Sequence, residues 1–121
     1  MDSLKKKILV VDDDEVLRDI LINFLKSNGY EAIGAKDGQK GLNLILVDQP
    51  DLIITGIHIP IMNGFQLLRA VKKLHPEPPV IFITSFPHFR RFYADKTARA
   101  DGFLEKPFSL EAIDNLVKKL I

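Results

Sequence analysis

Short apolar runs alternate with segments of helical periodicity along the chain, and this alternation constrains the fold more than any other feature. The apolar runs are rich in β-branched residues, which is typical of strands buried on both faces. Each run precedes a segment whose apolar residues recur at the spacing of one helical face. The expected strands are 8–11, 30–34, 52–55, 80–83 and 103–104, and the expected helices carry residues 17–25, 38–47, 64–74, 88–98 and 113–120.

This alternation predicts an α/β domain in which a doubly wound parallel sheet is covered by helices on both faces, with right-handed crossovers. A chain of 121 residues without a linker or low-complexity tract fits a single domain spanning residues 1–121. The helix residues expected to face the core are Leu17, Ile20, Leu21, Phe24, Leu25, Leu42, Ile45, Leu46, Leu67, Leu68, Val71, Leu74, Ile113, Leu116, Val117 and Leu120.

Composition narrows the function classes. The formal net charge is only +1, so the overall charge predicts no direct contact with nucleic acid or membrane. The absence of cysteine argues against a disulfide scaffold and a thiolate zinc site, and it suits a reducing cytoplasm. The lysine run near the start precedes too few apolar residues for a signal peptide or a membrane span, so we expect a cytoplasmic protein.

In doubly wound sheets the functional site lies beyond the carboxyl ends of the strands. The residues in those places are Asp12, Asp13 and Asp14, residues 56–60, Thr84 and Ser85, and residues 105–107. Adjacent carboxylates repel each other unless a cation lies against them, and Mg²⁺ prefers oxygen ligands. Asp12 and Asp13 therefore fit a magnesium site. They fit equally well a second interpretation, in which they are acids that interact with the positive end of the following helix. For Asp14 a helix cap is the simpler interpretation.

Lys106 and Thr84 each have two interpretations. Because Lys106 precedes Pro107, its backbone is expected to be extended or in a turn, and the bond between them can be cis. At the mouth of the sheet Lys106 suits phosphate binding, although alone it fits a solvated surface lysine. Thr84 fits a cap or loop residue, and its hydroxyl also suits a hydrogen bond to a phosphoryl oxygen.

Four stretches, ILVVDDDEVLR, PDLIITGIHIPIMNGFQLLR, VIFITS and ADGFLEKPFS, together resemble the receiver domain of bacterial response regulators over about residues 7–119. The resemblance implies a flavodoxin-like receiver fold, with five strands in the order 2-1-3-4-5, and a function in two-component phosphorelay signalling. In this family an aspartate at the end of the third strand accepts a phosphoryl group from a histidine kinase.

The resemblance also implies a role for each candidate site residue. The matched positions are Asp12, Asp13 and the backbone carbonyl of His58 for Mg²⁺, Thr84 for the switch hydroxyl, Lys106 for the lysine that pairs with the phosphate, and Phe103 for the switch aromatic. In the family, phosphorylation draws the threonine and the aromatic inward. This movement remodels the face made by the fourth helix, fifth strand and fifth helix.

The phosphorylated aspartate falls on position 56, which is Gly56 in this chain. Glycine has no atom that can attack phosphorus, so we expect no acyl phosphate at this site. The missing carboxylate should also weaken Mg²⁺ binding and leave Lys106 to turn toward Asp12 or Asp13. In one interpretation Gly56 replaces an aspartate, by drift or by design. In the other it has a structural role, because glycine permits unusual backbone angles and the close approach of another group.

No neighbouring side chain is expected to substitute for the missing aspartate. Asp51 lies about 16 Å away along a strand that rises about 3.3 Å per residue, which places it at the other end of the sheet. Thr55 should point to the opposite face. His58 should be solvent-exposed in a loop, although a phosphate acceptor or metal ligand there is an alternative.

The segment after the fourth strand is basic and aromatic. Its residues are Phe86, His88, Phe89, Arg90, Arg91, Phe92, Lys96 and Arg99. It forms either a solvated helix face or a docking surface, on which Asp101, Glu105 and Glu111 of a second copy would pair across a two-fold axis. The partners expected from the resemblance are therefore a histidine kinase, a downstream effector or a second copy of the chain.

Three function classes remain. The first is a signalling module, not an enzyme: a receiver domain that lacks the phosphorylatable aspartate and acts through protein–protein contacts. The second is a magnesium-dependent phosphatase-like enzyme of a related α/β fold, for which the nucleophile is again missing at Gly56. The third is a DNA-binding regulator in which this domain controls a separate effector.

Overall fold

The computed structural model describes residues 5–85 and 100–121, so the expected helix at 88–98 lies outside the described residues. The described elements follow the predicted order closely. The strands are β1 Lys7–Val11, β2 Glu31–Ala35, β3 Leu52–Gly56, β4 Val80–Thr84 and β5 Gly102–Glu105, and the helices are α1 Glu15–Ser27, α2 Gly38–Asp48, α3 Gly64–Leu74 and α6 Leu110–Leu120.

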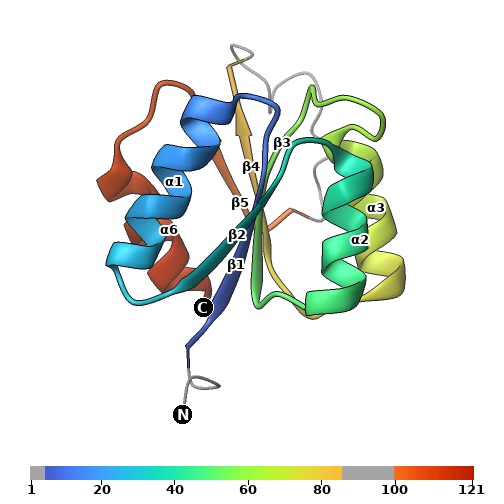
Figure 1. Cartoon of the computed structure of the whole chain (residues 1–121), viewed down its shortest axis with the longest axis horizontal. Coiled ribbons are helices and arrows are strands. Elements are labelled where there is room, and N and C mark those ends of the chain that lie inside the picture. The colour runs from blue at the N-terminus through green and yellow to red at the C-terminus, as the bar shows by residue number, and fades with distance from the viewer. Residues whose placement is uncertain (1–4, 86–99) are drawn as a thin grey trace.

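The five strands form one parallel sheet in the order β2-β1-β3-β4-β5, which confirms the predicted doubly wound topology. Helices α1 and α6 cover one face of the sheet, and α2 and α3 cover the other (Figure 1). Because all strands are parallel, their carboxyl ends meet at one edge of the sheet. The described residues that directly follow β1, β3, β4 and β5 therefore lie close together there.

Alternate residues of each strand enter two separate cores, as the pleat of a strand requires. On β1, for example, Leu9 and Val11 pack with the α2–α3 core, while Ile8 and Val10 pack with the α1–α6 core. All four of these side chains are fully buried. The strands are apolar on both faces because helices cover both faces.

Three of the helix residues that were expected to face the core are exposed instead. Ile20, Leu46 and Leu74 are 46%, 47% and 56% exposed, so this part of the prediction is wrong. Leu46 and Leu74 lie in the last turns of α2 and α3, and Ile20 lies next to the buried Leu21 on α1. In each helix the apolar stripe of the sequence is wider or longer than the surface that the sheet covers.

Each described helix begins at a side chain that caps its first turn. Asp14, Asp37, Asn63 and Ser109 accept hydrogen bonds from backbone N–H groups three residues further on. These caps determine where each loop ends and so where its side chains lie at the edge of the sheet. No helix within residues 5–85 or 100–121 combines the length and the apolar character needed to span a bilayer.

Candidate functional site

A small polar cavity lies at the carboxyl edge of the sheet, between the ends of β1, β3, β4 and β5. Its volume is about 120 Å³. The residues that line it are Asp12, Asp13, Gly56, Ile57, His58, Ile59, Ile83, Thr84, Ser85 and Lys106. The structure thus brings together six of the seven site residues named from the sequence, and only Phe103 lies outside the lining.

Asp12 is the central acid of this cavity and is only 1% exposed. Its Oδ1 accepts a hydrogen bond from the backbone N–H of Asp14 at 2.9 Å, and its Oδ2 lies 3.2 Å from Lys106 Nζ. A buried carboxylate needs such partners because it has lost the hydration that stabilises its charge. The prediction that Lys106 turns toward Asp12 or Asp13 is confirmed for Asp12.

The other two acids after β1 differ in their surroundings. Asp14 is the N-cap of α1 and accepts a hydrogen bond from the backbone N–H of Leu17 at 3.1 Å, which confirms the cap interpretation. Asp13 is exposed at the mouth of the cavity. Asp12 and Asp13 are therefore the acids that face the cavity, while Asp14 serves the helix.

Lys106 is held by its backbone as well as by its side chain. Its backbone N–H donates to the carbonyl of Thr84 at 2.6 Å, which ties the loop after β5 to the end of β4. The peptide bond between Lys106 and Pro107 is cis, as the sequence allowed. Thr84 is the last residue of β4, is 5% exposed and lines the same cavity as Lys106 and Asp12.

Gly56 is the last residue of β3 and is buried. Among the described glycines only Gly29 has a positive φ, so the interpretation that Gly56 serves unusual backbone angles is wrong. The other interpretation, that Gly56 allows another group to approach closely, is supported. A Cβ placed on Gly56 would lie 2.9 Å from Asp12 Oδ2 and 3.0 Å from Ile59 Cγ2. The Asp12 carboxylate, bonded to Lys106, thus lies against the space that a side chain at position 56 would enter.

The loop between β3 and α3 is anchored at both ends. Thr55 Oγ1 donates to the carbonyl of Gly56 at 2.8 Å, and the backbone N–H of Gly64 donates to the carbonyl of Ile57 at 2.8 Å. A Cβ on Gly64 would overlap the Gly56 carbonyl, so only glycine fits there without a shift. Within this loop Ile57 is buried, whereas His58 is exposed as expected.

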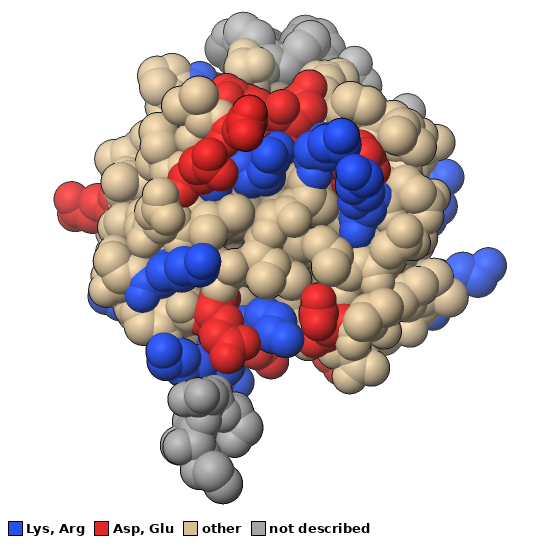
Figure 2. Space-filling model, in the orientation of Figure 1, with Lys and Arg blue, Asp and Glu red and all other residues tan. Residues whose placement is uncertain are grey.

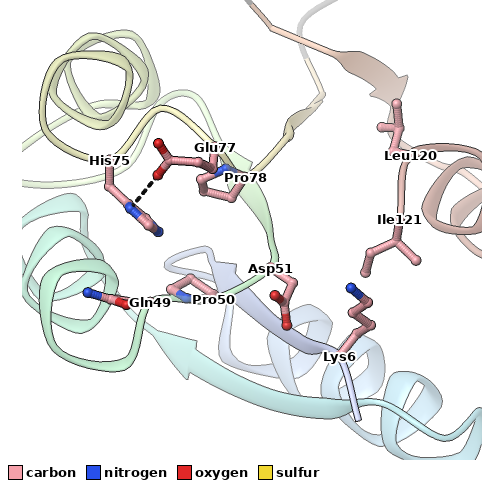
Figure 3. A pocket seen from close by; sticks show the side chains of 9 residues that line it. All are labelled: Lys6, Gln49, Pro50, Asp51, His75, Glu77, Pro78, Leu120 and Ile121. Carbon is pink, nitrogen blue, oxygen red and sulfur yellow. Dashed lines mark ion pairs between the residues drawn. The ribbon is translucent and has the colours of Figure 1, made fainter. Parts of the chain in front are cut away.

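Asp51 lies at the opposite edge of the sheet, so the prediction that it cannot reach position 56 is confirmed. Its Oδ2 accepts a hydrogen bond from the backbone N–H of Lys7 at 2.8 Å. Figure 3 shows it in a second hollow, of about 370 Å³, at the amino ends of the strands. In the same hollow His75 Nδ1 lies 2.9 Å from Glu77 Oε1.

Phe103 packs away from the cavity. Its ring meets that of Phe82 edge-on, with ring centroids 5.8 Å apart, and it lies against the α2–α3 core. It is half-buried on β5, the strand at one edge of the sheet.

The basic residues of the expected docking surface, including Arg90, Arg91 and Lys96, lie outside the described residues. On the described side of that surface, Glu111 is exposed in the first turn of α6. Asp101 is already engaged within the chain. Its Oδ2 accepts a hydrogen bond from the backbone N–H of Val80 at 2.8 Å and lies 3.4 Å from Lys72 Nζ.

The oxygen donors at the cavity suit Mg²⁺ in kind but are few in number. The carboxylates of Asp12 and Asp13 are of the type that Mg²⁺ prefers. Within residues 5–85 and 100–121, however, no three side chains of the His, Cys, Asp or Glu type gather closely enough to hold a metal ion. Lys106 Nζ also lies against one of the two Asp12 oxygens.

Arg18 is a contact of this site that the sequence did not indicate. Its Nη1 donates to the backbone carbonyl of Asp12 at 2.7 Å. Arg18 ends the stretch ILVVDDDEVLR, but the stretch assigns it no role, because the contact depends on how α1 packs beside the end of β1. The cavity is also lined by Ile57, Ile59 and Ile83, for which the sequence predicted only positions in a strand or a loop.

An open parallel sheet in the order 2-1-3-4-5, with acids, a hydroxyl and a lysine at its carboxyl edge, defines the class of flavodoxin-like α/β domains whose site lies at the switch in strand order. Within that class, residues 8–118 match the model of the response regulator receiver domain. The chain belongs to this family and is the receiver domain of a two-component response regulator.

Known relatives agree with this assignment. The response regulator MprA of Mycolicibacterium vanbaalenii is 35% identical over 107 residues, which cover 88% of this chain and 46% of that protein. The chain thus spans about half the length of the curated relatives that it matches. Because the match is to receiver domains, the alternative of a phosphatase-like enzyme is not supported.

Solved structures show the same fold. The chemotaxis response regulator CheY4 of Vibrio cholerae has a TM-score of 0.87 and 28% identity, with 97% of this chain and 99% of that chain covered. The response regulator TrrA of Thermotoga maritima, in complex with Mg²⁺ and BeF, has a TM-score of 0.87 and 30% identity, with 96% and 99% covered.

Proposed function

We infer that this receiver domain signals without aspartyl phosphorylation and acts through protein–protein contacts. The observation that carries this inference is Gly56, the last residue of β3, beside Asp12, Thr84 and Lys106 in one cavity. In the family this is the place of the phosphorylated aspartate. Glycine offers no nucleophile, and phosphoryl transfer to a receiver requires one.

The neighbouring residues support this proposal. Asp51 is at the far edge of the sheet, and the hydroxyl of Thr55 is directed to the carbonyl of Gly56. His58 is exposed in the loop after β3. None of the three places a nucleophile where a side chain at position 56 would lie.

The remaining family residues keep their proposed roles in a weakened site. Asp12, Asp13 and the backbone carbonyl of His58 would hold Mg²⁺, which supplies positive charge for phosphoryl oxygens in such sites. We expect the affinity for Mg²⁺ to be low, because the third carboxylate is missing and Lys106 already pairs with Asp12. Lys106 then acts mainly as a structural counter-ion.

Without a phosphoryl group, the balance between the inactive and active conformations depends on the fold and on binding partners. Thr84 and Phe103 are the proposed switch residues. The proposed partners are a histidine kinase, a downstream effector or a second copy of the chain bound through the fourth helix, fifth strand and fifth helix. We further expect no enzymatic activity and, from the absence of cysteine, a cytoplasmic location.

The test is phosphorylation by a small-molecule donor. The purified chain and its Gly56→Asp variant are incubated with Mg²⁺ and acetyl phosphate or phosphoramidate, and their intact masses are measured. We expect a phosphoryl adduct on the variant and none on the wild-type chain. An acid-stable or acid-labile adduct on the wild-type chain would show that another residue accepts the group, and the proposal would be wrong.

A further inference from the structure

Strand β2 is at one edge of the sheet, and its outer side is not paired with any other described strand. The backbone N–H of Glu31 donates to the carbonyl of Lys6 at 2.9 Å, and the carbonyl of Ala35 accepts from the backbone N–H of Asp12 at 3.1 Å. Because alternate residues of a strand direct their backbone groups to opposite edges, Ala32 and Gly34 direct theirs away from β1. Of these two residues Gly34 is exposed, whereas Ala32 is only 6% exposed. Such an edge is a template for a further strand. In Figure 1 this edge faces the viewer, between α1 and α2.

A groove of about 450 Å³ lies along the carboxyl half of this edge. Its lining residues are Arg18, Gly34, Ala35, Lys36, Lys40, Asn43 and Leu44. Gly34 is exposed and has no side chain to cover the strand edge. The side chains of Ile22 and Arg18 lie beside it instead, 2.7 Å and 3.1 Å from where a Cβ would be.

The groove is positively charged. Arg18, Lys36 and Lys40 contribute to it from α1, the end of β2 and α2. Figure 2 shows Lys and Arg side chains gathered in the upper middle of this face, with Asp and Glu side chains above them. In the part of the chain that the structure describes, Lys36 and Lys40 form no salt bridge.

Asp37, the acid nearest to these lysines in sequence, does not pair with them. Asp37, between the two lysines in sequence, is 4% exposed, and its carboxylate caps α2 by accepting from the backbone N–H of Lys40 at 2.8 Å. Arg18 uses Nη1 to bind the Asp12 carbonyl, which leaves other N–H groups of its guanidinium directed elsewhere. The groove therefore combines the outward backbone groups of Gly34 with three basic side chains, two of which form no salt bridge within the described residues.

We propose that this edge groove binds an acidic, extended segment of a partner protein, which pairs as a strand with β2 while its carboxylates contact Arg18, Lys36 and Lys40. A polypeptide backbone complements both the N–H and the C=O of the exposed Gly34, whereas a phosphate group can only accept hydrogen bonds. A nucleic acid fits less well, because the net charge is only +1 and acids border the groove. The groove shares no lining residue with the cavity at Gly56, although Arg18 also contacts the Asp12 carbonyl, so the proposal does not require phosphorylation at that cavity.

The test uses a short fluorescein-labelled peptide of alternating glutamate and threonine and measures its binding to the whole chain by fluorescence anisotropy. The charge-reversal variant Lys36→Glu/Lys40→Glu should bind about tenfold more weakly or worse. The matched control Lys73→Glu/Lys119→Glu changes two exposed lysines in the last turns of α3 and α6, and binding should change by less than about twofold. Amide chemical shifts should change along β2, α1 and α2.

A second peptide tests strand pairing. Methylation of alternate backbone nitrogens removes hydrogen-bond donors without changing the charge, and it should weaken binding about tenfold. The proposal is overturned if the acidic peptide does not bind, if the control variant loses as much affinity, or if the methylated peptide binds equally well. It is also overturned if inorganic phosphate or a DNA duplex displaces the peptide and produces the same amide shifts, because the groove would then be a general anion site. Equal urea unfolding curves for both variants would show that folding does not explain the difference.

Discussion

At the level of single residues, the absence of a side chain at position 56 mainly affects the surroundings of Asp12. The Asp12 carboxylate lies 2.9 Å from the space where a Cβ on Gly56 would be, and Lys106 Nζ lies 3.2 Å from the same oxygen. A lysine paired with a buried acid has a structural role whether or not phosphate ever binds. Two substitutions separate this structural role from the family's signalling role.

Replacing Gly56 with aspartate should destabilise the chain when Mg²⁺ is absent. The new Cβ crowds a movable carboxylate oxygen, and a second carboxylate beside Asp12 adds repulsion, so we expect a loss of about 1–3 kcal/mol in the free energy of unfolding. Millimolar Mg²⁺ should restore the loss by binding the folded state. Urea unfolding with and without Mg²⁺ measures both effects.

The Gly56→Asn variant is the control, because it has nearly the same shape without the charge. It should lose stability by crowding alone and should not respond to Mg²⁺. If Mg²⁺ stabilises the wild-type chain as much as the aspartate variant, the proposed low affinity for Mg²⁺ is wrong.

Replacing Lys106 with methionine should remove the counter-ion of the buried Asp12 carboxylate and leave the hydrogen bond from the backbone N–H of Asp14. We expect a loss of about 1–3 kcal/mol, because Asp12 is buried while Lys106 is 27% exposed and partly screened by solvent. The control Lys119→Met, on the exposed side of α6, should change the free energy of unfolding by less than about 0.5 kcal/mol. Equal losses in chemical denaturation would contradict a structural ion pair.

At the level of elements, the connection between β3 and α3 determines the geometry of the cavity. Asn63 and Gln66 form a reciprocal capping box at the start of α3, with hydrogen bonds of 2.9 Å in both directions. Gly64 follows the cap and lets the helix approach the end of β3 closely. The position of the loop that lines the cavity therefore depends on a residue that does not itself line it.

The Gly64→Ala variant tests this dependence. Its Cβ would overlap the carbonyl of Gly56 and lie 2.8 Å from Ile57 Cα, and backbone atoms cannot rotate away as a side chain can. We expect a loss of about 1–3 kcal/mol together with amide shifts at Asp12 and Thr84. The control Gly29→Asn, at φ +92° in open space, should lose less than about 1 kcal/mol and leave those amides unchanged. Unshifted amides in the Gly64 variant would show that the loop does not position the cavity.

At the level of the whole molecule, the two cores share one sheet, and we propose that the chain folds as a single unit. Phe82 on β4 is fully buried, and its ring meets those of Phe65 and Phe103 edge-on, with centroids 5.8 Å from each. It links α3, β4 and β5 across the α2–α3 core. Loss of this ring should therefore lower the stability of the whole domain.

The Phe82→Ala variant should lose about 3–5 kcal/mol, the usual cost of removing a buried aromatic ring. Urea unfolding followed by far-ultraviolet circular dichroism and by tyrosine fluorescence should give coincident midpoints, shifted equally in the variant. Leu74→Ala, at a side chain that is 56% exposed, is the matched control and should lose much less. Separate midpoints for the two probes would show that the chain is not one cooperative unit.

Sequence reasoning identified the candidate site because parallel topology dictates where strand ends meet. Once five apolar runs alternate with helices, Asp12, Gly56, Thr84 and Lys106 must all lie at the same edge. The sequence also predicted Asp14 as a helix cap, because the Asp14 carboxylate and the backbone N–H of Leu17 that donates to it are only three residues apart. The exposure of Ile20 could not be predicted, because periodicity defines a stripe on a helix but not how much of it the sheet covers.

What the sequence determined by itself is the order of the elements, their alternation and the chemical types at each strand end, because periodicity and capping act over a few neighbouring residues. Only the tertiary structure decided which atoms meet. The bond between Lys106 and Asp12 joins residues 94 positions apart, and the basic groove joins α1, β2 and α2. Such contacts depend on which strands are neighbours and on how closely the helices pack against them. These properties belong to the assembled sheet and not to any local stretch of chain.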